Sequence, residues 1–397
     1  MTPPLLPQRI ADGFSMFRAM TGDRIHVAAH SHHWWPDVSR EAQIAAWDDA
    51  ARLVDDKWEH ALGDVWSAVK RRIAAILSLP DPETLVPAPN THELINRLLS
   101  CFPADRPAKV IATDGEFHSF RRQSARLVED GALALTLVSA EPHHSLADRL
   151  IAAVRAEPDV DMVFFSQVLF NSGFALVDLD AIVDAVAAPG RFIVIDGYHG
   201  FLARPTDLSR IADRAFYIAG GYKYAMSGEG ACFMHAPPGF GPRPRNTGWY
   251  ASFGALSETQ SGVPYASDGW RFMGATFDPS GLYRMRAALD WLAAEGVSAA
   301  MLHAHAIALQ ERFLDALSPR PVGPFEEEQL VTPRAETARG NFLTFEHPDA
   351  GAWRRRLHDI GIVADVRGDR LRLGFGAYHT VDDIDRLVAR LKARWRV

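Results

Sequence analysis

Short continuous runs of apolar residues alternate along this chain with amphipathic stretches. Runs such as Phe192-Ile193-Val194-Ile195 are apolar on both faces of an extended chain, which predicts buried strands of a mostly parallel sheet. The stretches between them repeat apolar residues every three or four positions, which predicts helices. We expect strands at 109–112, 132–138, 161–168, 191–196, 216–219 and 231–234, and helices at 90–102, 119–130, 146–156 and 179–187. The order predicts an α/β fold whose sheet is flanked by helices.

The segments on either side of this region extend the picture. Helical patterns run from Pro36 onward and over 62–77, whereas segment 236–278 is rich in Pro, Gly and aromatic residues and resembles a functional loop. The C-terminal part predicts helices at 282–294, 298–317, 352–360 and 382–395, and strands at 341–345, 362–366 and 370–375. We therefore predict an N-terminal arm over 1–35, a large domain over 36–280 and a small α/β domain over 281–397.

Composition narrows the class of protein. A chain of 397 residues with 48% hydrophobic and 23% charged residues suits a globular protein with one large and one smaller domain. The net charge of −7 argues against nucleic acid or an anionic membrane as partner, because both attract basic clusters. The two cysteines, Cys101 and Cys232, show no metal-type spacing, so we expect no metal and a reducing cytoplasm. We also expect no signal peptide and no membrane span.

Lysine is scarce, and one lysine stands apart from the others. The chain has five, Lys57, Lys70, Lys109, Lys223 and Lys392, and four of these lie in charged helices or at a strand start. Lys223 instead lies in the Gly-rich segment 219–230, which has little charge and follows a predicted buried strand. A lysine removed from water has a lowered pKa and becomes a nucleophile or a base. A surface lysine in a turn is the alternative, and this segment alone does not separate the two.

Asp196 favours the chemical interpretation of Lys223. It ends the apolar strand at 192–195, and ligands of open α/β sheets bind beyond the carboxyl ends of strands. A carboxylate there can pair with the protonated pyridine nitrogen of pyridoxal 5′-phosphate (PLP) and keep that ring an electron sink. A helix cap is the alternative role for a strand-end Asp. The two residues lie one crossover apart, and the pair is more specific than either residue.

These residues carry a family resemblance. Asp196-x-x-His199, followed by Gly221-Tyr222-Lys223-Tyr224, resembles the class V aminotransferase family of fold type I PLP-dependent enzymes, and most of all the kynureninases. The resemblance runs from about residue 25 to the C-terminus in matching order and is strongest around Lys223. It implies a mostly parallel sheet of the seven-stranded type and PLP held by Lys223 as a Schiff base.

The resemblance also implies a set of cofactor contacts. Backbone N–H groups and the hydroxyl at a helix start would take the phosphate, an aromatic side chain would stack on the ring, and others would reach the phenolic oxygen or the phosphate. A helix cap and a core Phe are the alternatives for the first two. The implied cofactor-binding residues are Thr91, His92, Phe117, Gln167 (in Ser166-Gln167), Asp196, His199, Tyr222, Lys223, Trp249 and Thr276. Because the family takes the Thr276 equivalent from across a dimer interface, we expect a homodimer with shared active sites.

On the substrate side, Arg372 matches the arginine that binds the α-carboxylate of an amino acid, a task that suits a bidentate guanidinium. A strand-face arginine paired with Asp365 or Asp369 is the alternative. The chain departs from the family elsewhere: its N-terminal Asn-Ser-Leu-Gly is His30-Ser31-His32-His33 here, segment 249–252 lacks the usual His, and segment 169–173 lacks the usual Arg. We expect His30 and Ser31 to face the substrate, with exposed histidines as the alternative and a metal site as the weaker one.

The resemblance implies a reaction on an amino-acid substrate. The amine would displace Lys223, which would then act as general base on Cα while the ring held by Asp196 takes the electrons. We favour kynureninase-like hydrolysis of a Cβ–Cγ bond, with transamination and β-elimination as alternatives. A catalytically silent PLP-fold binding protein and an unrelated doubly wound protein are rivals from other classes. The intact Lys223, Asp196 and Arg372 argue against the first, and the order of the motifs argues against the second.

Overall fold

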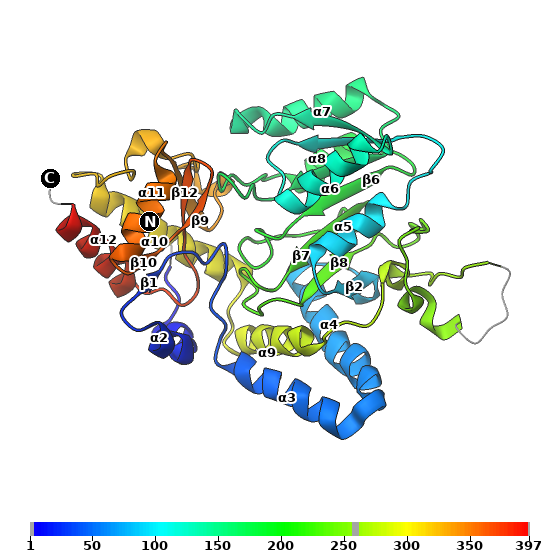
Figure 1. The fold of residues 1–397 in the computed structure, drawn as a ribbon, viewed down its shortest axis with the longest axis horizontal. Coiled ribbons are helices and arrows are strands. Elements are labelled where there is room, and N and C mark those ends of the chain that lie inside the picture. Colours follow the sequence, from blue (N-terminus) through cyan, green and yellow to red (C-terminus); the bar gives the residue numbers. More distant parts are fainter. Residues whose placement is uncertain (1–3, 256–261, 396–397) are drawn as a thin grey trace.

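A seven-stranded sheet forms the centre of the large part of the molecule in a computed structural model that describes residues 4–255 and 262–395 (Figure 1). Its strand order is β2-β8-β7-β6-β5-β3-β4, and β8 alone runs against the others, pairing antiparallel with both β2 and β7. The expected mostly parallel sheet is therefore confirmed. The strands are β2 (Leu85–Ala88), β3 (Ala108–Thr113), β4 (Leu133–Val138), β5 (Met162–Ser166), β6 (Phe192–Asp196), β7 (Ala215–Gly220) and β8 (Cys232–His235).

Burial explains why these residues form strands. Every residue of β5, β6 and β7 is buried, as expected for strands covered on both faces, whereas the edge strand β4 alternates towards solvent. The sequence pattern missed β2, because Pro87 argues against a strand. Pro87 is tolerated here because β2 lies at the edge and pairs only with β8, so the missing N–H leaves no ladder bond unmade.

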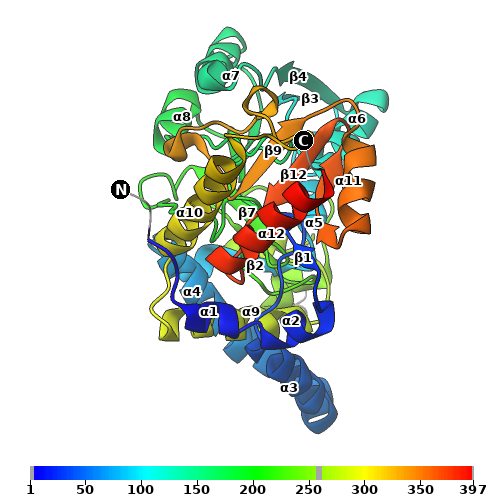
Figure 2. The ribbon, with the colours of Figure 1, turned by 90° about the vertical axis from the view of Figure 1, so that its left-hand side faces the viewer.

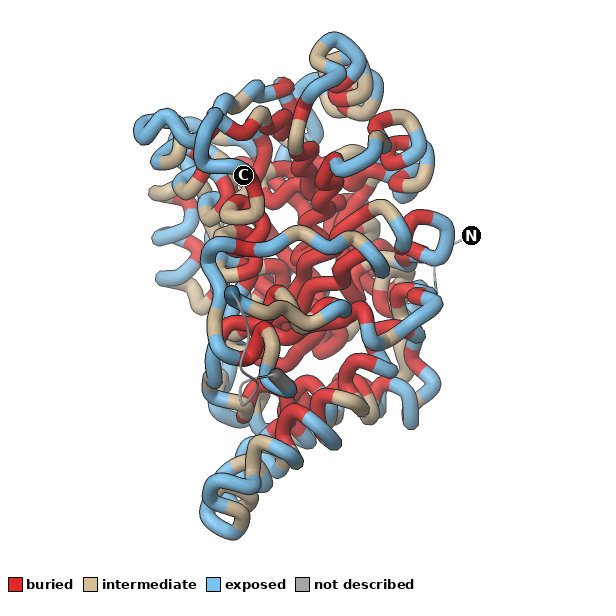
Figure 3. Tube along the Cα trace, turned by 90° about the vertical axis from the view of Figure 1, so that its right-hand side faces the viewer, coloured by how far each residue is buried: buried red, intermediate tan, exposed pale blue. Residues whose placement is uncertain are grey.

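Helices cover the sheet and then build a second layer beside it. α5, α6 and α7 pack on its strands, while α3, α4 and α9 pack on one another, and the buried residues form a continuous interior (Figure 3). The helices are α1 (Gln8–Asp12), α2 (Ser15–Thr21), α3 (Val38–Leu53), α4 (Trp66–Leu77), α5 (Thr91–Leu99), α6 (His118–Glu129), α7 (Leu146–Ala156), α8 (Leu179–Val186), α9 (Ser280–Ala294), α10 (Ala299–Leu317), α11 (Ala350–Asp359) and α12 (Val381–Arg394). Single turns and short irregular helices lie at Val54–Asp56, Glu59–Val65, Pro82–Thr84, His143–Ser145, Trp249–Ala255, Gly269–Phe272, Glu327–Gln329 and Glu336–Ala338.

The C-terminal part has its own sheet and its own core. Its antiparallel sheet has the order β11-β12-β9, and α10, α11 and α12 pack around it (Figure 2). The N-terminal arm joins the two parts: Ile25 lies in the second core, whereas Phe14 and Trp34 lie in the first. The remaining strands are β1 (Ile25–His26), β9 (Phe342–Glu346), β10 (Ile362–Val363), β11 (Asp365–Arg367) and β12 (Arg370–Gly374), with β1 pairing in parallel with β10.

The predicted boundary between residues 280 and 281 falls at the start of α9. The apolar side chains of α9, among them Leu282 and Leu289, lie in the core of the large part, and the second core begins at Ala306 within α10. The change from one core to the other therefore lies inside α10.

Among the described helices, none alone is long and apolar enough to cross a membrane. α9 and α10 meet those criteria only as a pair, and the two are bent by 84° at the break between them.

Candidate active site

A cavity of about 170 Å³ lies where the carboxyl ends of β5, β6 and β7 meet the start of α5. Parallel strands that end at one edge of a sheet bring the loops after them together, so residues far apart in sequence converge here. The lining residues include most of the predicted cofactor contacts: Thr91, His92, Phe117, Asp196, His199, Tyr222 and Lys223.

Lys223 occupies the centre of this site. Its side chain is 4% exposed, its Nζ lies 2.7 Å from His199 Nε2, and the ring centre of Tyr198 lies 4.5 Å away. Burial lowers the pKa of the Lys223 amine from 10.5 to about 7, against the opposing effect of the Asp196 carboxylate. A large share of the amine is therefore uncharged at neutral pH, which is the form that attacks carbonyl carbon and accepts protons.

His199 completes the surroundings of the amine. Burial lowers its pKa well below the usual range, so the imidazole is neutral. When Nε2 accepts a hydrogen bond from Lys223, Nδ1 carries the ring hydrogen. That buried Nδ1 has no hydrogen-bond partner among the described residues. His199 thus offers an unused donor beside Lys223.

Asp196 lies at the end of β6, opposite Ser166 of β5 in the sheet register. One carboxylate oxygen accepts a hydrogen bond from the backbone N–H of Tyr198 at 2.9 Å. Burial raises the pKa of Asp196, whereas the nearby Lys223 charge lowers it. A buried carboxylate without a directly paired cation is suited to receive a cationic group of a ligand.

The start of α5 forms the opposite wall. Asn90 caps this helix by accepting a hydrogen bond from the backbone N–H of Glu93 at 3.0 Å, which leaves the N–H groups of Thr91 and His92 without a helical partner. Among the described lining residues, Lys223 is the only lysine or arginine. A phosphate in this cavity would therefore rest on uncharged N–H and O–H donors and on the helix dipole.

The structure differs from the sequence analysis at Gln167. Its side chain points away from the cavity: Nε2 donates to Thr206 at 2.8 Å, and Oε1 accepts from the Tyr217 hydroxyl at 3.0 Å. The preceding residue, Ser166, lines the cavity instead. Neighbouring residues at the end of a strand point to opposite faces, so the choice between the two required the register of β5.

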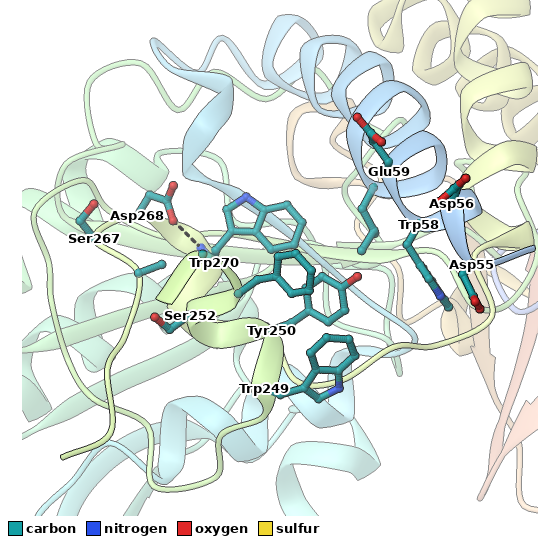
Figure 4. A pocket seen from close by; sticks show the side chains of 14 residues that line it. Asp55, Asp56, Trp58, Glu59, Trp249, Tyr250, Ser252, Ser267, Asp268 and Trp270 are labelled. Carbon is teal, nitrogen blue, oxygen red and sulfur yellow. Dashed lines mark hydrogen bonds between the residues drawn. The ribbon is translucent and has the colours of Figure 1, made fainter. Parts of the chain in front are cut away.

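Trp249 and Thr276 do not line this cavity either. Trp249 is 44% exposed and borders an open hollow of about 810 Å³, where its ring lies tilted against that of Tyr250 and Trp58 lines the same hollow (Figure 4). Thr276 lines a neighbouring hollow that Trp58 also borders. Both predicted phosphate contacts thus lie on adjoining surfaces away from the Lys223 cavity of the same chain.

Arg372 is 2% exposed and already has partners. Its Nη2 forms an ion pair with Asp365 across the β11–β12 hairpin, and its Nη1 donates to the carbonyl of Phe170. Its Nε has no partner among the described residues. The alternative pairing with Asp365 is therefore present, while the unused Nε leaves a donor for a carboxylate. Asp365 also pairs with Arg367 at 2.9 Å.

The histidine segment divides between the site and the surface. His30 is fully buried, stacks on Phe342 with ring centres 4.7 Å apart, and lies 3.6 Å from Asp365. Burial lowers its pKa to about 3, so it is neutral. Ser31 is half-buried, and exposed His32 stacks on Tyr222. Buried His33 instead donates from Nδ1 to the Trp34 carbonyl and accepts at Nε2 from the backbone N–H of Ala377.

Over residues 4–255 and 262–395, no group of three or more His, Cys, Asp or Glu side chains is arranged to hold a metal ion. Cys232 lines the Lys223 cavity, but burial raises the pKa of its thiol to about 11. Cys232 is therefore a neutral thiol rather than a nucleophilic thiolate at physiological pH.

Comparison with known proteins shows which proteins this chain is similar to. The kynureninase C-terminal domain model matches residues 302–391. The isopenicillin N epimerase of Streptomyces clavuligerus is 28% identical over 96% of this chain and 91% of its own length. The kynureninase of Deinococcus radiodurans is 31% identical over 59% of this chain and 57% of its own. A structure of C-DES with glycine covalently linked to its PLP cofactor superimposes with a TM-score of 0.79 at 18% identity, over 97% of this chain and 99% of the other.

These matches support a class V aminotransferase-like family close to kynureninase. The chain has the fold of PLP-dependent enzymes, and the matched kynureninases and cysteine desulfurases are PLP-dependent families.

The Lys223 cavity has the groups that PLP needs. A neutral amine suits covalent attachment of an aldehyde, a buried carboxylate at Asp196 suits a pyridinium, and the free N–H groups at the start of α5 suit a phosphate. The unpartnered Nδ1 of His199 supplies one more donor. The residues present therefore fit the cofactor.

Proposed function

We propose that this PLP-dependent enzyme removes the Cα proton of an amino acid and then, like the kynureninases, hydrolyses the bond between Cβ and a γ-carbonyl carbon. The buried Lys223 amine, with its pKa lowered to about 7 beside Asp196 and His199, is the observation that supports this most directly. PLP, when bound, withdraws electrons from Cα of the attached amino acid. The protein's own residues then have to hold the substrate and move the proton.

Lys223 is the residue placed to move that proton. A base is most effective when its pKa lies near the working pH, and burial brings the amine to that range. His199, neutral and 2.7 Å from Nζ, orients the amine and can pass a hydrogen onward through its two nitrogens. Asp196 holds its charge against the cofactor ring, which favours electron withdrawal.

Arg372 supports an α-amino acid as substrate. Its guanidinium is buried beside Phe170 and Phe342, and Nε remains free for a carboxylate oxygen while Nη2 is shared with Asp365. When the substrate carboxylate binds there, Arg367 can keep Asp365 paired. The α-carboxylate would thereby be held at a fixed distance from Lys223, which directs Cα towards the amine.

Epimerisation at Cα is the second candidate. It is supported by the match to isopenicillin N epimerase, which spans nearly the whole of both chains. Both reactions begin with loss of the same proton, so the residues described above serve either. Transamination and β-elimination share that step as well.

One experiment separates these outcomes. The holoenzyme is incubated in D₂O with L-kynurenine and, separately, with a panel of L-amino acids, and products are identified by NMR and chiral chromatography. Anthranilate and alanine released from kynurenine support hydrolysis. Deuterium at an inverted Cα with the carbon skeleton intact supports epimerisation, and a keto acid formed only with an added amino acceptor supports transamination. If no substrate exchanges its Cα hydrogen, the proposal fails.

We further infer a homodimer whose protomers share active sites. Trp249 and Thr276, expected at the phosphate, lie instead on a surface with exposed aromatic side chains, namely Trp47 at 71% and Phe253 at 55% exposure. If a second copy covers this surface, Trp249 and Thr276 of one protomer would lie near the Lys223 cavity of its partner. Light scattering should give twice the chain mass, and Trp249→Ala should weaken PLP binding. A monomer with full PLP affinity contradicts the inference.

Placement in the cytoplasm and the absence of a nucleic-acid partner stay predictions from composition.

A further inference from the structure

Glu116 is a buried carboxyl group that the proposed reaction does not use. It follows β3, its side chain is fully buried, and its hydrogen-bond partners are all uncharged. Thr113 Oγ1 and the backbone N–H of Ser166 donate to Glu116 Oε1, at 2.5 Å and 3.2 Å, while Ser166 Oγ lies 2.5 Å from Oε2. Ser166 lines the Lys223 cavity and pairs in register with Asp196. Glu116 therefore reaches the cavity through one serine hydroxyl.

The hydrogen bonds decide which oxygen of Glu116 can hold a proton. Thr113 Oγ1 accepts a hydrogen bond from the backbone N–H of Gly115 at 3.2 Å and donates to Glu116 Oε1. With Ser166 N, that oxygen already accepts two hydrogens. Oε2 faces only the Ser166 hydroxyl. A proton on Glu116 therefore lies on Oε2 and is directed at Ser166 Oγ.

We propose that Glu116 is a positioning residue whose protonation sets the direction of the Ser166 hydroxyl. When Glu116 is protonated, Oε2 donates to Ser166 Oγ, and the Ser166 hydrogen is free to donate into the cavity. When Glu116 is ionised, Ser166 must give its hydrogen to Oε2 and presents only lone pairs to the cavity. The proposal rests on this cavity being the cofactor site.

The switch operates near neutral pH. Burial, with a smaller contribution from the Asp196 carboxylate, raises the pKa of Glu116 to about 7 against the hydrogen bonds from Ser166 and Thr113. The other titratable groups nearby are Lys223 beyond Asp196, Asp114 at the surface after β3, and exposed His118 at the start of α6. The donor form of Ser166 therefore predominates below about pH 7 and the acceptor form above it.

An anionic oxygen of a ligand is bound better by the donor form, because the acceptor form turns lone pairs towards it. PLP and related compounds have such oxygens on both the phosphate and the ring. Ser166 and Glu116 together would hence make cofactor binding tighter on the acid side of neutrality, independently of the chemistry at Lys223.

The test uses pyridoxine 5′-phosphate, which has no aldehyde and cannot bond to Lys223. Its dissociation constant is measured by calorimetry between pH 6 and pH 8.5 for the wild type, Glu116→Gln, Ser166→Ala and the double variant. Gln reproduces protonated Glu116, since its carbonyl can accept both Oε1 bonds and its amide can donate to Ser166. Dividing each wild-type constant by that of Glu116→Gln cancels the titration of the ligand itself.

We expect this ratio to change about tenfold across the pH range, the value of one hydrogen bond to a charged group. The same ratio taken on the Ser166→Ala background should stay constant with pH. A wild-type ratio that is flat, or a pH-dependent ratio that persists without the Ser166 hydroxyl, overturns the inference while leaving the cofactor site intact. Absence of binding to every protein, the wild type included, overturns the cofactor site and this inference together.

Discussion

Burying Lys223 should make the protein less stable than it would be with an apolar residue at the same place. The Lys223→Met variant, studied in protein freed of PLP, removes the charge while keeping a flexible chain of similar length. Burial lowers the pKa of the amine from 10.5 to about 7. The Lys223 amine therefore binds a proton more weakly in the folded chain than in the unfolded chain. At pH values between these two pKa values the unfolded state binds more protons than the folded state. The free energy of unfolding of the wild type therefore rises with pH in this range.

The magnitude follows from those two pKa values. Compared with an uncharged residue at this position, the buried lysine lowers the free energy of unfolding by about 4 kcal/mol at pH 7 and by about 2 kcal/mol at pH 9. The variant also loses the hydrogen bond to His199, which contributes about 1 kcal/mol. We therefore expect Lys223→Met to raise the free energy of unfolding by about 3 kcal/mol at pH 7 and about 1 kcal/mol at pH 9.

Urea unfolding followed by tryptophan fluorescence at the two pH values measures this difference. Lys392→Met, at an exposed position of α12, is the matched control and should change stability little at either pH. The reasoning is refuted if Lys223→Met is no more stable than the wild type at pH 7. It is equally refuted if the gain does not shrink between pH 7 and pH 9.

Three further substitutions probe the site and its packing. Asp196→Asn keeps the shape of the side chain but removes the charge beside the cofactor, so turnover should fall about 100-fold while absorbance shows PLP still bound. Undiminished turnover would contradict the role assigned to Asp196. Arg372→Lys keeps the charge but loses the fork geometry, so KM should rise about tenfold with kcat little changed; steady-state kinetics with an unaltered KM would exclude it as the carboxylate contact. Gly374→Ala would place a methyl group against the His30 ring and should lower stability by about 2 kcal/mol, seen as a lower melting temperature; an unchanged melting temperature would show that the ring can move aside.

Local pattern was enough to predict most of the fold. The strands β5, β6 and β7 are buried throughout, and β5 and β6 are apolar up to Ser166 and Asp196 at their carboxyl ends. They were predicted within two residues of their ends, because parallel strands buried on both faces have few polar positions. β2 was missed because its signal is weak: four residues that include Pro87, held in place by pairing with β8, more than 140 residues further along the chain. The pairing partner, rather than the segment itself, makes this a strand.

Some features of the candidate site also have a signal in the local sequence, whereas others depend on tertiary packing. Gln167 and Ser166 are neighbours that point to opposite faces of the sheet. A shift of one residue in register therefore decides which of the two faces the cavity. The ion pair of Arg372 with Asp365 has a sequence signal, because a tight hairpin at 368–369 sets these residues opposite each other. Glu116 has no such signal. Its neighbours Thr113 and Ser166 come from two different strands, and only their packing shows that it is buried.

The sequence by itself determined that Lys223 and Asp196 end up together, because residues that follow parallel strands meet at one edge of the sheet. The family resemblance carried by the residues around that pair also indicated the class of cofactor. Only the tertiary structure decided how far each group is removed from water, which partners Arg372 has, and where Trp249 and Thr276 lie. The physical reason is that strand position is a local property of the chain, whereas pKa, hydrogen-bond direction and exposure depend on every element packed around a group.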